Sequence, residues 1–265
     1  KVLDPAMGSG HILVYAFDVL YDIYKSEGYS ERDIPRLILE NNLYGLDIDD
    51  RAAQLAYFAV MMKARSKSRR IFREKVNINI CSIQESNGFP KEAIDYLVNT
   101  EETEIEKRMH REDVEYLTNV FHDAKEYGSI LEVKPIDFDA IERRVEEIRN
   151  GGTGDLFEYQ YRNIILDKIP ALVKQARIMS QKYDVVVTNP PYMGSRKSMN
   201  SKVKKFTERN YPNAKADLYA CFIEKCLELS SAKSYTGMVT QQSFMFTDDY
   251  KNLRQSLLDS INIIN

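Results

Sequence analysis

The sequence has no long apolar run, few cysteines and little net charge, and each shortage narrows the class of protein. No stretch approaches the roughly 18 consecutive apolar residues of a membrane-spanning helix, so we expect no membrane partner. The three cysteines, Cys81, Cys221 and Cys226, form no Cys-x-x-Cys pair, which argues against a disulfide framework or a structural zinc site. Reduced thiols of this kind favour a cytoplasmic protein, and we expect it to bind no metal.

The formal net charge of −3 argues against a uniformly basic nucleic-acid binder, but the charges are segregated. Residues 91–150 carry 17 acidic and 9 basic side chains. By contrast, residues 64–75 and 192–215 carry six and seven Lys or Arg, against one Glu each. Such runs are usually solvated faces. Whether these two have a binding role therefore depends on the motifs beside them.

Apolar periodicity predicts strands that alternate with helices. The predicted strands are Val2–Leu3, 43–47, 76–80, 183–188 and 236–240, and the predicted helices include 12–24, 33–41, 51–64, 217–230 and 248–259. This alternation indicates an α/β fold with a doubly wound, mostly parallel, Rossmann-like sheet. The chain starts at Lys1 and stops in an apolar stretch, 261–265, that reads like the start of a strand. We therefore expect a domain truncated at both ends and part of a longer protein.

The alternation is interrupted by a long stretch rich in Glu, Lys and Arg with helical periodicity. We therefore predict that residues 1–84 and 181–265 are two halves of one α/β domain. Residues 85–180 would form an acidic helical insertion between them.

A glycine-containing turn, Asp4-Pro-Ala-Met-Gly8-Ser-Gly10, connects the first predicted strand to a helix, where doubly wound sheets bind ligands. The glycines let the backbone approach a ligand closely, but Leu13 stands where a dinucleotide fingerprint has its third glycine. Asp4 would repel a pyrophosphate and suits a cationic group. Asp47, at the end of the second strand, is placed to accept two ribose hydroxyls. A ribose ligand with a positive end and no phosphates describes S-adenosylmethionine better than NAD.

The tetrapeptide Asn189-Pro-Pro-Tyr192 directly follows a predicted buried strand and is the most specific signal. Prolines lack a backbone donor, so the loop offers carbonyl oxygens, an amide and an aromatic ring. The Asn189 side-chain oxygen and the Pro190 carbonyl can hold both N–H groups of an exocyclic amine and free its lone pair to attack a methyl group. Positioning and electrostatics would carry the rate. Tyr192 would stack on the heterocycle and offset the cost of flipping a base from a duplex.

The second basic run begins at this tetrapeptide, which makes contacts with nucleic-acid phosphates a reasonable expectation. The residues we expect to make them are Arg196, Lys197, Lys202, Lys204 and Lys205.

Together these residues resemble the class I, S-adenosylmethionine-dependent N6-adenine DNA methyltransferases. DPAMGSG is similar to their cofactor motif I, LYGLDID to motif II and NPPY to catalytic motif IV, in the order of the gamma subgroup. The stretch from NPPYMGSRKSMN to NYPNAKADLYACFIEKCLEL resembles the methyltransferases of BREX-type phage-defence systems more closely still. The resemblance covers about residues 1–84 and 180–260. It implies methyl transfer to a flipped-out adenine of double-stranded DNA, alongside other subunits of a defence complex.

The resemblance also implies residue roles, with residues 1–84 as the cofactor-binding half and 181–265 as the catalytic half. The cofactor would meet the turn, the end of the second strand and motif V, that is Asp4, Pro5, Ala6, Gly8, Gly10, Asp47, Ile48 and Asp217. The catalytic loop would comprise Asn189, Pro190, Pro191 and Tyr192.

The sequence departs from the family pattern in two ways. The third motif usually carries an acidic residue near the cofactor adenine, but Asn77–Ser82 offers only Cys81 or Ser82. We expect backbone groups or Ser82 to hold that adenine amino group. Motif X and a target-recognition domain are missing from these residues, so we do not expect them to encode the reading of a DNA sequence.

Two other functions fit parts of the pattern. The same tetrapeptide occurs in enzymes that methylate protein glutamine amides or RNA, although the insertion and the basic run favour DNA. A third reading is an inactive cofactor-binding scaffold that presents its acidic insertion to partner proteins.

Overall fold

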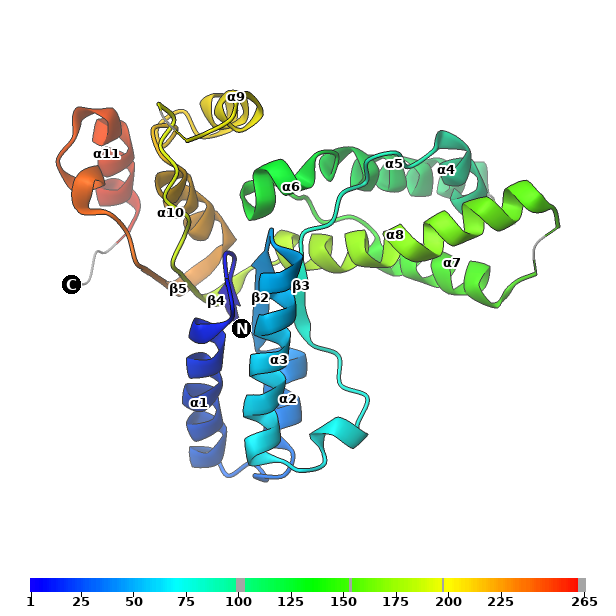
Figure 1. Ribbon diagram of the computed structural model, residues 1–265, viewed down its shortest axis with the longest axis horizontal. Helices are drawn as coiled ribbons and strands as arrows, with labels where there is room; N and C mark the ends of the chain where they lie inside the picture. Colours follow the sequence, from blue (N-terminus) through cyan, green and yellow to red (C-terminus); the bar gives the residue numbers. More distant parts are fainter. Residues whose placement is uncertain (99–102, 153, 197, 262–265) are drawn as a thin grey trace. The chain divides into compact units, whose positions relative to one another are not determined.

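The structure is a computed structural model that describes residues 1–98, 103–152, 154–196 and 198–261. The chain divides into two compact units (Figure 1). The first, here called the sheet unit, comprises Lys1–Asp47, Arg51–Ile80 and Lys182–Asn265. The second, here called the helical unit, comprises Ile48–Asp50 and Cys81–Gln181. Residues 262–265 of the predicted final strand lie outside the described residues.

A five-stranded sheet with the order β3-β2-β1-β4-β5 organises the fold (Figure 1). Strand β1 (Val2–Asp4) runs parallel to β2 (Leu43–Asp47) and to β4 (Tyr183–Thr188), and β4 runs parallel to β5 (Ser230–Met238). Strand β3 (Asn79–Ser82) forms the opposite edge. The continuous burial of Leu43–Leu46 is typical of parallel strands covered on both faces. The predicted doubly wound α/β fold is confirmed, and the strand order reverses between β1 and β4.

Three helices follow β1 and β2 along the chain: α1 (His11–Ser26), α2 (Ile34–Asn41) and α3 (Asp50–Lys67). Their apolar faces bury Leu13, Phe17, Ile38, Ala56 and Val60 in one core cluster with residues of the strands. Helix α10 (Leu218–Leu229) connects β4 to β5. Shorter elements complete the sheet unit, namely α9 (Ser201–Asn210), α11 (Lys251–Ser260), η1 (Ile71–Arg73), η3 (Gln242–Met245) and η4 (Asp248–Tyr250).

The predicted bounds are confirmed for β2 and β4 and are wrong for both edge strands. Strand β3 begins at Asn79, three residues later than predicted, because Val76 and Ile78 pack against the core before the strand begins. Strand β5 begins at Ser230, six residues earlier than predicted. Its first half, Ser-Ser-Ala-Lys-Ser, is mostly polar and contains no buried residue, so hydrophobic periodicity could not reveal it.

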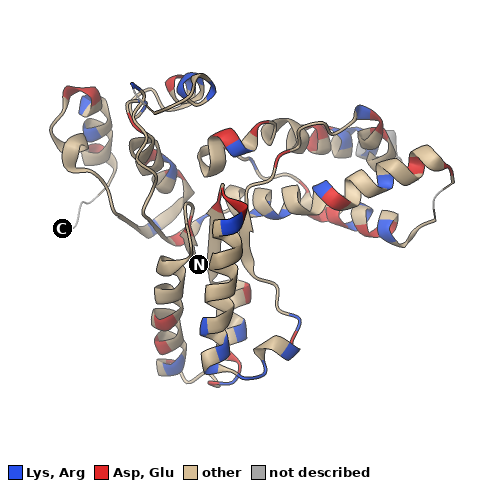
Figure 2. Ribbon diagram, in the orientation of Figure 1, with Lys and Arg blue, Asp and Glu red and all other residues tan. Residues whose placement is uncertain are grey.

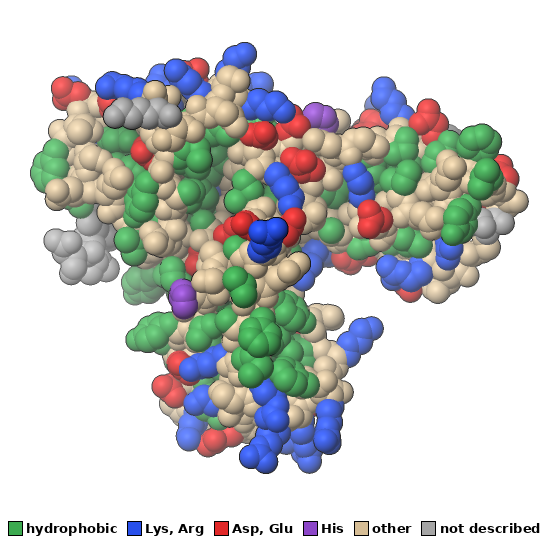
Figure 3. Space-filling view, in the orientation of Figure 1, with side chains coloured by type: hydrophobic (Ala, Val, Ile, Leu, Met, Phe, Trp, Pro, Cys, Tyr) green, Lys and Arg blue, Asp and Glu red, His purple; other side chains and the backbone are tan. Residues whose placement is uncertain are grey.

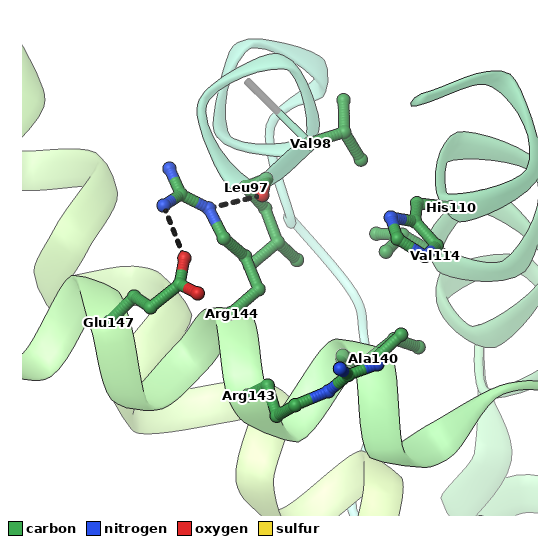
Figure 4. Close-up of a pocket in the computed structure, with 9 residues that line it drawn as sticks. Leu97, Val98, His110, Val114, Ala140, Arg143, Arg144 and Glu147 are labelled. Carbon is green, nitrogen blue, oxygen red and sulfur yellow. Dashed lines mark hydrogen bonds and ion pairs between the residues drawn. The ribbon is translucent and has the colours of Figure 1, made fainter. Parts of the chain in front are cut away.

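The helical unit consists mainly of α4 (Lys91–Val98), α5 (Glu104–Val120), α6 (Ala124–Tyr127), η2 (Gly128–Ile130), α7 (Phe138–Asn150) and α8 (Leu156–Ser180). Acidic and basic side chains are interspersed along these helices (Figure 2). Arg144 on α7 binds the end of α4, where its Nε donates to the Leu97 carbonyl at 2.9 Å (Figure 4). On its own helix, the Nη1 of Arg144 pairs with Glu147 at 3.0 Å (Figure 4). A cation at a helix C-terminus stabilises that end. No described helix combines the length and the apolar composition that a bilayer crossing demands.

The glycine at position 10 is predicted to be necessary for the packing of α1 against α3. Gly10 has φ +83°, and a Cβ there would lie 2.9 Å from both Cα and Cβ of Ala56. Gly28, just after α1, has a similar φ of +81° but no atom within 4 Å of its Cβ position. Gly10→Ala should therefore lower the free energy of unfolding by about 3 kcal/mol, and Gly28→Ala by about 1 kcal/mol.

Urea denaturation of the two variants beside the wild type measures both effects. Because the backbone strain is shared, the difference between them isolates the helix contact. Equal losses of stability would contradict a close approach of α1 and α3.

Candidate active site

The glycine turn and the end of β2 are joined directly. The Gly8 amide donates to Asp47 Oδ2 at 2.8 Å, and the Met7 amide donates to the Leu46 carbonyl at 3.0 Å. Gly8 reaches this position with φ +53°, a conformation that glycine adopts at little cost. The structure thus brings together the turn and the carboxylate that the sequence predicts for a ribose.

The missing third glycine of the turn is compensated in the neighbouring strand. A Cβ at Gly45 of β2 would lie 2.5 Å from Met7 Sδ and 2.7 Å from Leu13 Cδ1. The space that the dinucleotide fingerprint creates on the helix is here created on β2, which lets a leucine occupy position 13 and still pack closely.

Asp4 ends β1 and is fully buried. Its Oδ1 accepts a hydrogen bond from the Ala6 amide at 3.1 Å. Burial raises the pKa of its carboxyl to about 7; the nearby Thr188 hydroxyl and the Ala6 amide lower it in part, and the charge of Asp47 raises it. Neither Asp4 Oδ2 nor Thr188 Oγ1 has a partner of good hydrogen-bond geometry among the described residues. A buried carboxylate oxygen without a partner is costly, so this position favours a ligand that brings a donor or a cation.

The Asn189–Tyr192 loop leaves β4 beside Thr188, and its tyrosine holds its asparagine. The Tyr192 hydroxyl lies 3.2 Å from Asn189 Oδ1 and 2.9 Å from the Val239 carbonyl. The Val239 amide in turn donates to the Thr188 carbonyl at 3.1 Å. Asn189, Pro191 and Tyr192 are exposed, whereas Pro190 is buried. An amide carbonyl has two acceptor lone pairs, so Asn189 Oδ1 retains one for a further donor.

Asp217 fixes the far side of this loop. Its carboxylate caps α10 by accepting from the Tyr219 amide at 3.3 Å, and it accepts from the Met193 amide at 2.9 Å. The buried Tyr219 ring packs against Tyr192, with ring centroids 5.8 Å apart and planes tilted by 52°. In this arrangement Asp217 positions the loop, and its predicted role in lining the cofactor pocket stays a prediction.

The remaining cofactor residues are placed as follows. Pro5 is buried and Ala6 is partly buried within the turn, and Ile48 is 46% exposed just after β2. Ser82 ends β3 in the helical unit, where its hydroxyl accepts a hydrogen bond from Gln84 Nε2 at 2.8 Å. In the described part of the chain, no three His, Cys, Asp or Glu side chains are grouped so that they could hold a metal ion.

The predicted phosphate-binding residues lie on and just before α9. Lys202, Lys204 and Lys205 are exposed on this helix, and Figure 3 shows basic side chains gathered over it. Arg196 is exposed and pairs with Asp249 at 3.6 Å. Lys197 lies outside the described residues.

Sequence reasoning missed several residues of this neighbourhood. Thr188 and Val239 carry no motif of their own, although Thr188 directly precedes the tetrapeptide.

Comparisons with known proteins agree with the motifs. Residues 41–265 match the Eco57I restriction-modification methylase family. The adenine-specific methyltransferase BrxX of Escherichia coli O9:H4 (strain HS) is 40% identical over an alignment of 286 residues, which covers 100% of this chain and 23% of that protein. The adenine-specific methyltransferase PglX of Lacticaseibacillus casei (strain Zhang) is 37% identical over 261 residues, covering 96% of this chain and 20% of that protein. The chain thus spans less than a quarter of the length of these curated relatives.

A solved structure is also similar. The nuclease-deletion mutant of the Type ISP restriction-modification enzyme LlaGI, in complex with a DNA substrate mimic, is 15% identical with a TM-score of 0.47. The match covers 97% of this chain and 16% of that one.

The resemblance that the motifs indicated is confirmed by the family match and by the two methyltransferase relatives. The family match extends over most of the sequence, from before β2 to the last residue, and includes the catalytic tetrapeptide. The chain belongs to the Eco57I restriction-modification methylase family.

Proposed function

We propose that this protein transfers a methyl group from S-adenosylmethionine to the N6 amino group of adenine in double-stranded DNA, within a phage-defence or restriction-modification system. The observation that carries the proposal is that the Asn189–Tyr192 loop and Asp4 follow or end the neighbouring parallel strands β4 and β1, and that Asp4 Oδ2 is buried with no hydrogen-bond partner among the described residues. The names of the two relatives, both adenine-specific methyltransferases, support it. A DNA substrate would place the protein in the cytoplasm.

The residues of the sheet unit fit S-adenosylmethionine. When bound, this cofactor supplies an electrophilic methyl group. Asp4 Oδ2, buried without a partner in the described part of the chain, would accept the ammonium group, and Asp47, held by the Gly8 amide, would accept ribose hydroxyls. The Asp4 carboxylate beside the turn would repel a pyrophosphate, which makes a dinucleotide the poorer candidate.

The loop after β4 fits an aromatic amine. Asn189 Oδ1 and the Pro190 carbonyl would accept the two N–H groups, which directs the nitrogen lone pair toward the methyl group. The proton would leave after attack, when the nitrogen is acidic, so no strong base is needed. The Tyr192 ring, supported by Tyr219, would stack on the base. Arg196, Lys202, Lys204 and Lys205 would contact the DNA backbone.

Location of the transferred methyl group tests the function. The protein is incubated with labelled S-adenosylmethionine and, in separate reactions, duplex DNA, RNA or protein. We expect label in DNA, on N6 of adenine after nucleoside digestion. Label recovered only in protein or RNA would overturn the proposed substrate, and no label in any of them would favour an inactive scaffold.

Asn189→Ala should reduce methyl transfer by about 10²–10³-fold or more, because one of two acceptors that hold the amine is lost. Affinity for the cofactor should change little. Tyr192→Phe keeps the ring but frees Asn189 and should have a smaller effect, about 10-fold. Single-turnover kinetics and calorimetry separate the two quantities.

Asn210→Ala, on the exposed end of α9, is the matched control for Asn189→Ala and should retain full activity. An Asn189 variant with unchanged turnover would remove this side chain from the reaction.

Asp4→Asn should stabilise the protein at pH 8 while weakening cofactor binding. The carboxyl ionises near pH 4 in the unfolded chain and near pH 7 in the folded one, so the wild type loses stability as pH rises between these values. The full difference corresponds to about 4 kcal/mol, and the asparagine variant does not incur it. Urea denaturation at pH 5 and pH 8 checks this prediction. Parallel pH profiles for the two proteins would contradict a raised pKa at Asp4.

A further inference from the structure

The segment between β5 and α11 presents apolar side chains to solvent. Residues 239–250 connect these two elements (Figure 1), and η3 within them contains no buried residue. Val239 is 59% exposed, Met245 is 50% exposed and Phe246 is 74% exposed. Phe246 is the most exposed large hydrophobic side chain among the described residues. Single exposed apolar residues are common on protein surfaces, whereas a group of them in one short connection indicates a contact surface.

The backbone of this segment is fixed, although its apolar side chains are exposed. Arg254 of α11 donates from Nη1 to the Phe244 carbonyl at 2.8 Å and to the Thr247 carbonyl at 2.6 Å. The amides of Phe246 and Thr247 donate to the Ser243 carbonyl at 3.2 and 3.0 Å. Phe246 is therefore carried by a braced turn, and little conformational entropy would be lost when its ring meets a ligand.

The same segment is bound to the loop that we propose holds the target base. The Val239 carbonyl accepts from the Tyr192 hydroxyl at 2.9 Å. The Ser243 hydroxyl lies 2.8 Å from the hydroxyl of Tyr219, whose ring packs against Tyr192. The Tyr219 ring also packs against Tyr250, with centroids 6.0 Å apart. All of these residues belong to the sheet unit, so the exposed apolar segment adjoins the tyrosine that is expected to stack on an extruded base.

The charges of the segment are compatible with an approach to DNA. Asp248 and Asp249 are in the first turn of η4, which leads directly into α11, and carboxylates are stabilised at such an N-terminus. Asp249 also pairs with Arg196 at 3.6 Å. Arg196 is one of the residues that we propose contact the DNA backbone, so this ion pair connects the segment to the basic run.

Extrusion of a base from a duplex opens a gap in the base stack, and opening it costs free energy. Proteins that open a stack frequently insert an apolar side chain, Phe and Met among them, between two base steps. An aromatic ring suits this role at any sequence, because every base has a face on which it can stack. An exposed ring on a braced turn beside the catalytic loop has these properties.

We propose that Phe246, with Met245 beside it, inserts into the base stack next to the extruded adenine and stabilises the opened duplex. The inference rests on the proposed function, because it names the part of the protein that keeps the target base out of the helix. Tyr192 stacks on the extruded base, and Phe246 replaces the stacking that the duplex loses.

Methyl transfer to two forms of one duplex tests the proposal. A methylated site is first located by mapping N6-methyladenine in plasmid DNA treated with the protein. A duplex of that sequence is then made in its normal form and with an abasic position opposite the target adenine. Extrusion costs less in the abasic form, because no base pair is broken. Phe246→Ala should lower kcat/KM by about 10-fold on the normal duplex and by less than about 3-fold on the abasic duplex.

Phe246→Trp keeps an aromatic ring and should retain the wild-type kcat/KM on both duplexes within about 2-fold. The matched control is Tyr235→Ala, which removes a similarly exposed ring from β5 and should change neither value. Unchanged methyl transfer by Phe246→Ala on the normal duplex overturns the proposal. An equal loss on both duplexes also overturns it, because the ring would then act on the catalytic loop and not on the opened stack. If the wild type methylates no adenine in plasmid DNA, the proposed function itself is wrong.

Discussion

The burial of one carboxylate at the centre of the sheet constrains the rest of the site. Asp4 lies at the end of β1, next to the strand where the sheet order reverses, and one of its oxygens has no partner among the described residues. Its environment is apolar enough to raise the pKa to about 7. Natural proteins tolerate such costs mainly where a ligand offsets them. The glycine turn, Asp47 and the Asn189–Tyr192 loop surround the same end of the sheet and define what that ligand can be.

Much of the fold could be predicted because the central strands have a clear sequence pattern. The runs 43–47 and 183–188 are apolar, β-branched or aromatic in large part and are bounded by turn residues, and both bounds agree with the structure. Strand β5 could not be found from periodicity, because an edge strand needs little apolar content and Ser230–Ser234 has almost none. For β3, Val76 and Ile78 are apolar because they pack on the core, which displaced the predicted strand.

The candidate site was predictable where chemistry requires particular residue types at fixed spacing. Asp4, Gly8, Gly10, Asp47 and the tetrapeptide are such residues, and hydrogen bonds within the sheet unit connect Gly8 to Asp47 and Tyr192 to Asn189. Within the helical unit, the hydrogen bonds from the Gln175 side chain to the backbone of Gln84 could not be predicted, because the two residues lie 91 positions apart and a lone glutamine in a helix carries no pattern. The role of Gly45 could not be predicted for a similar reason. The space that it provides for Leu13 is evident only when the strand and the helix are packed together.

The most direct test of the central claim is the number of protons exchanged when the cofactor binds. At pH 6 the buried carboxyl of Asp4 is mostly protonated in the free protein, and an ammonium group favours its ionised form. Calorimetric titration with S-adenosylmethionine in buffers of different ionisation enthalpy should therefore reveal release of about one proton per site, falling toward zero by pH 8. A binding heat that does not depend on the buffer at pH 6 would contradict the account.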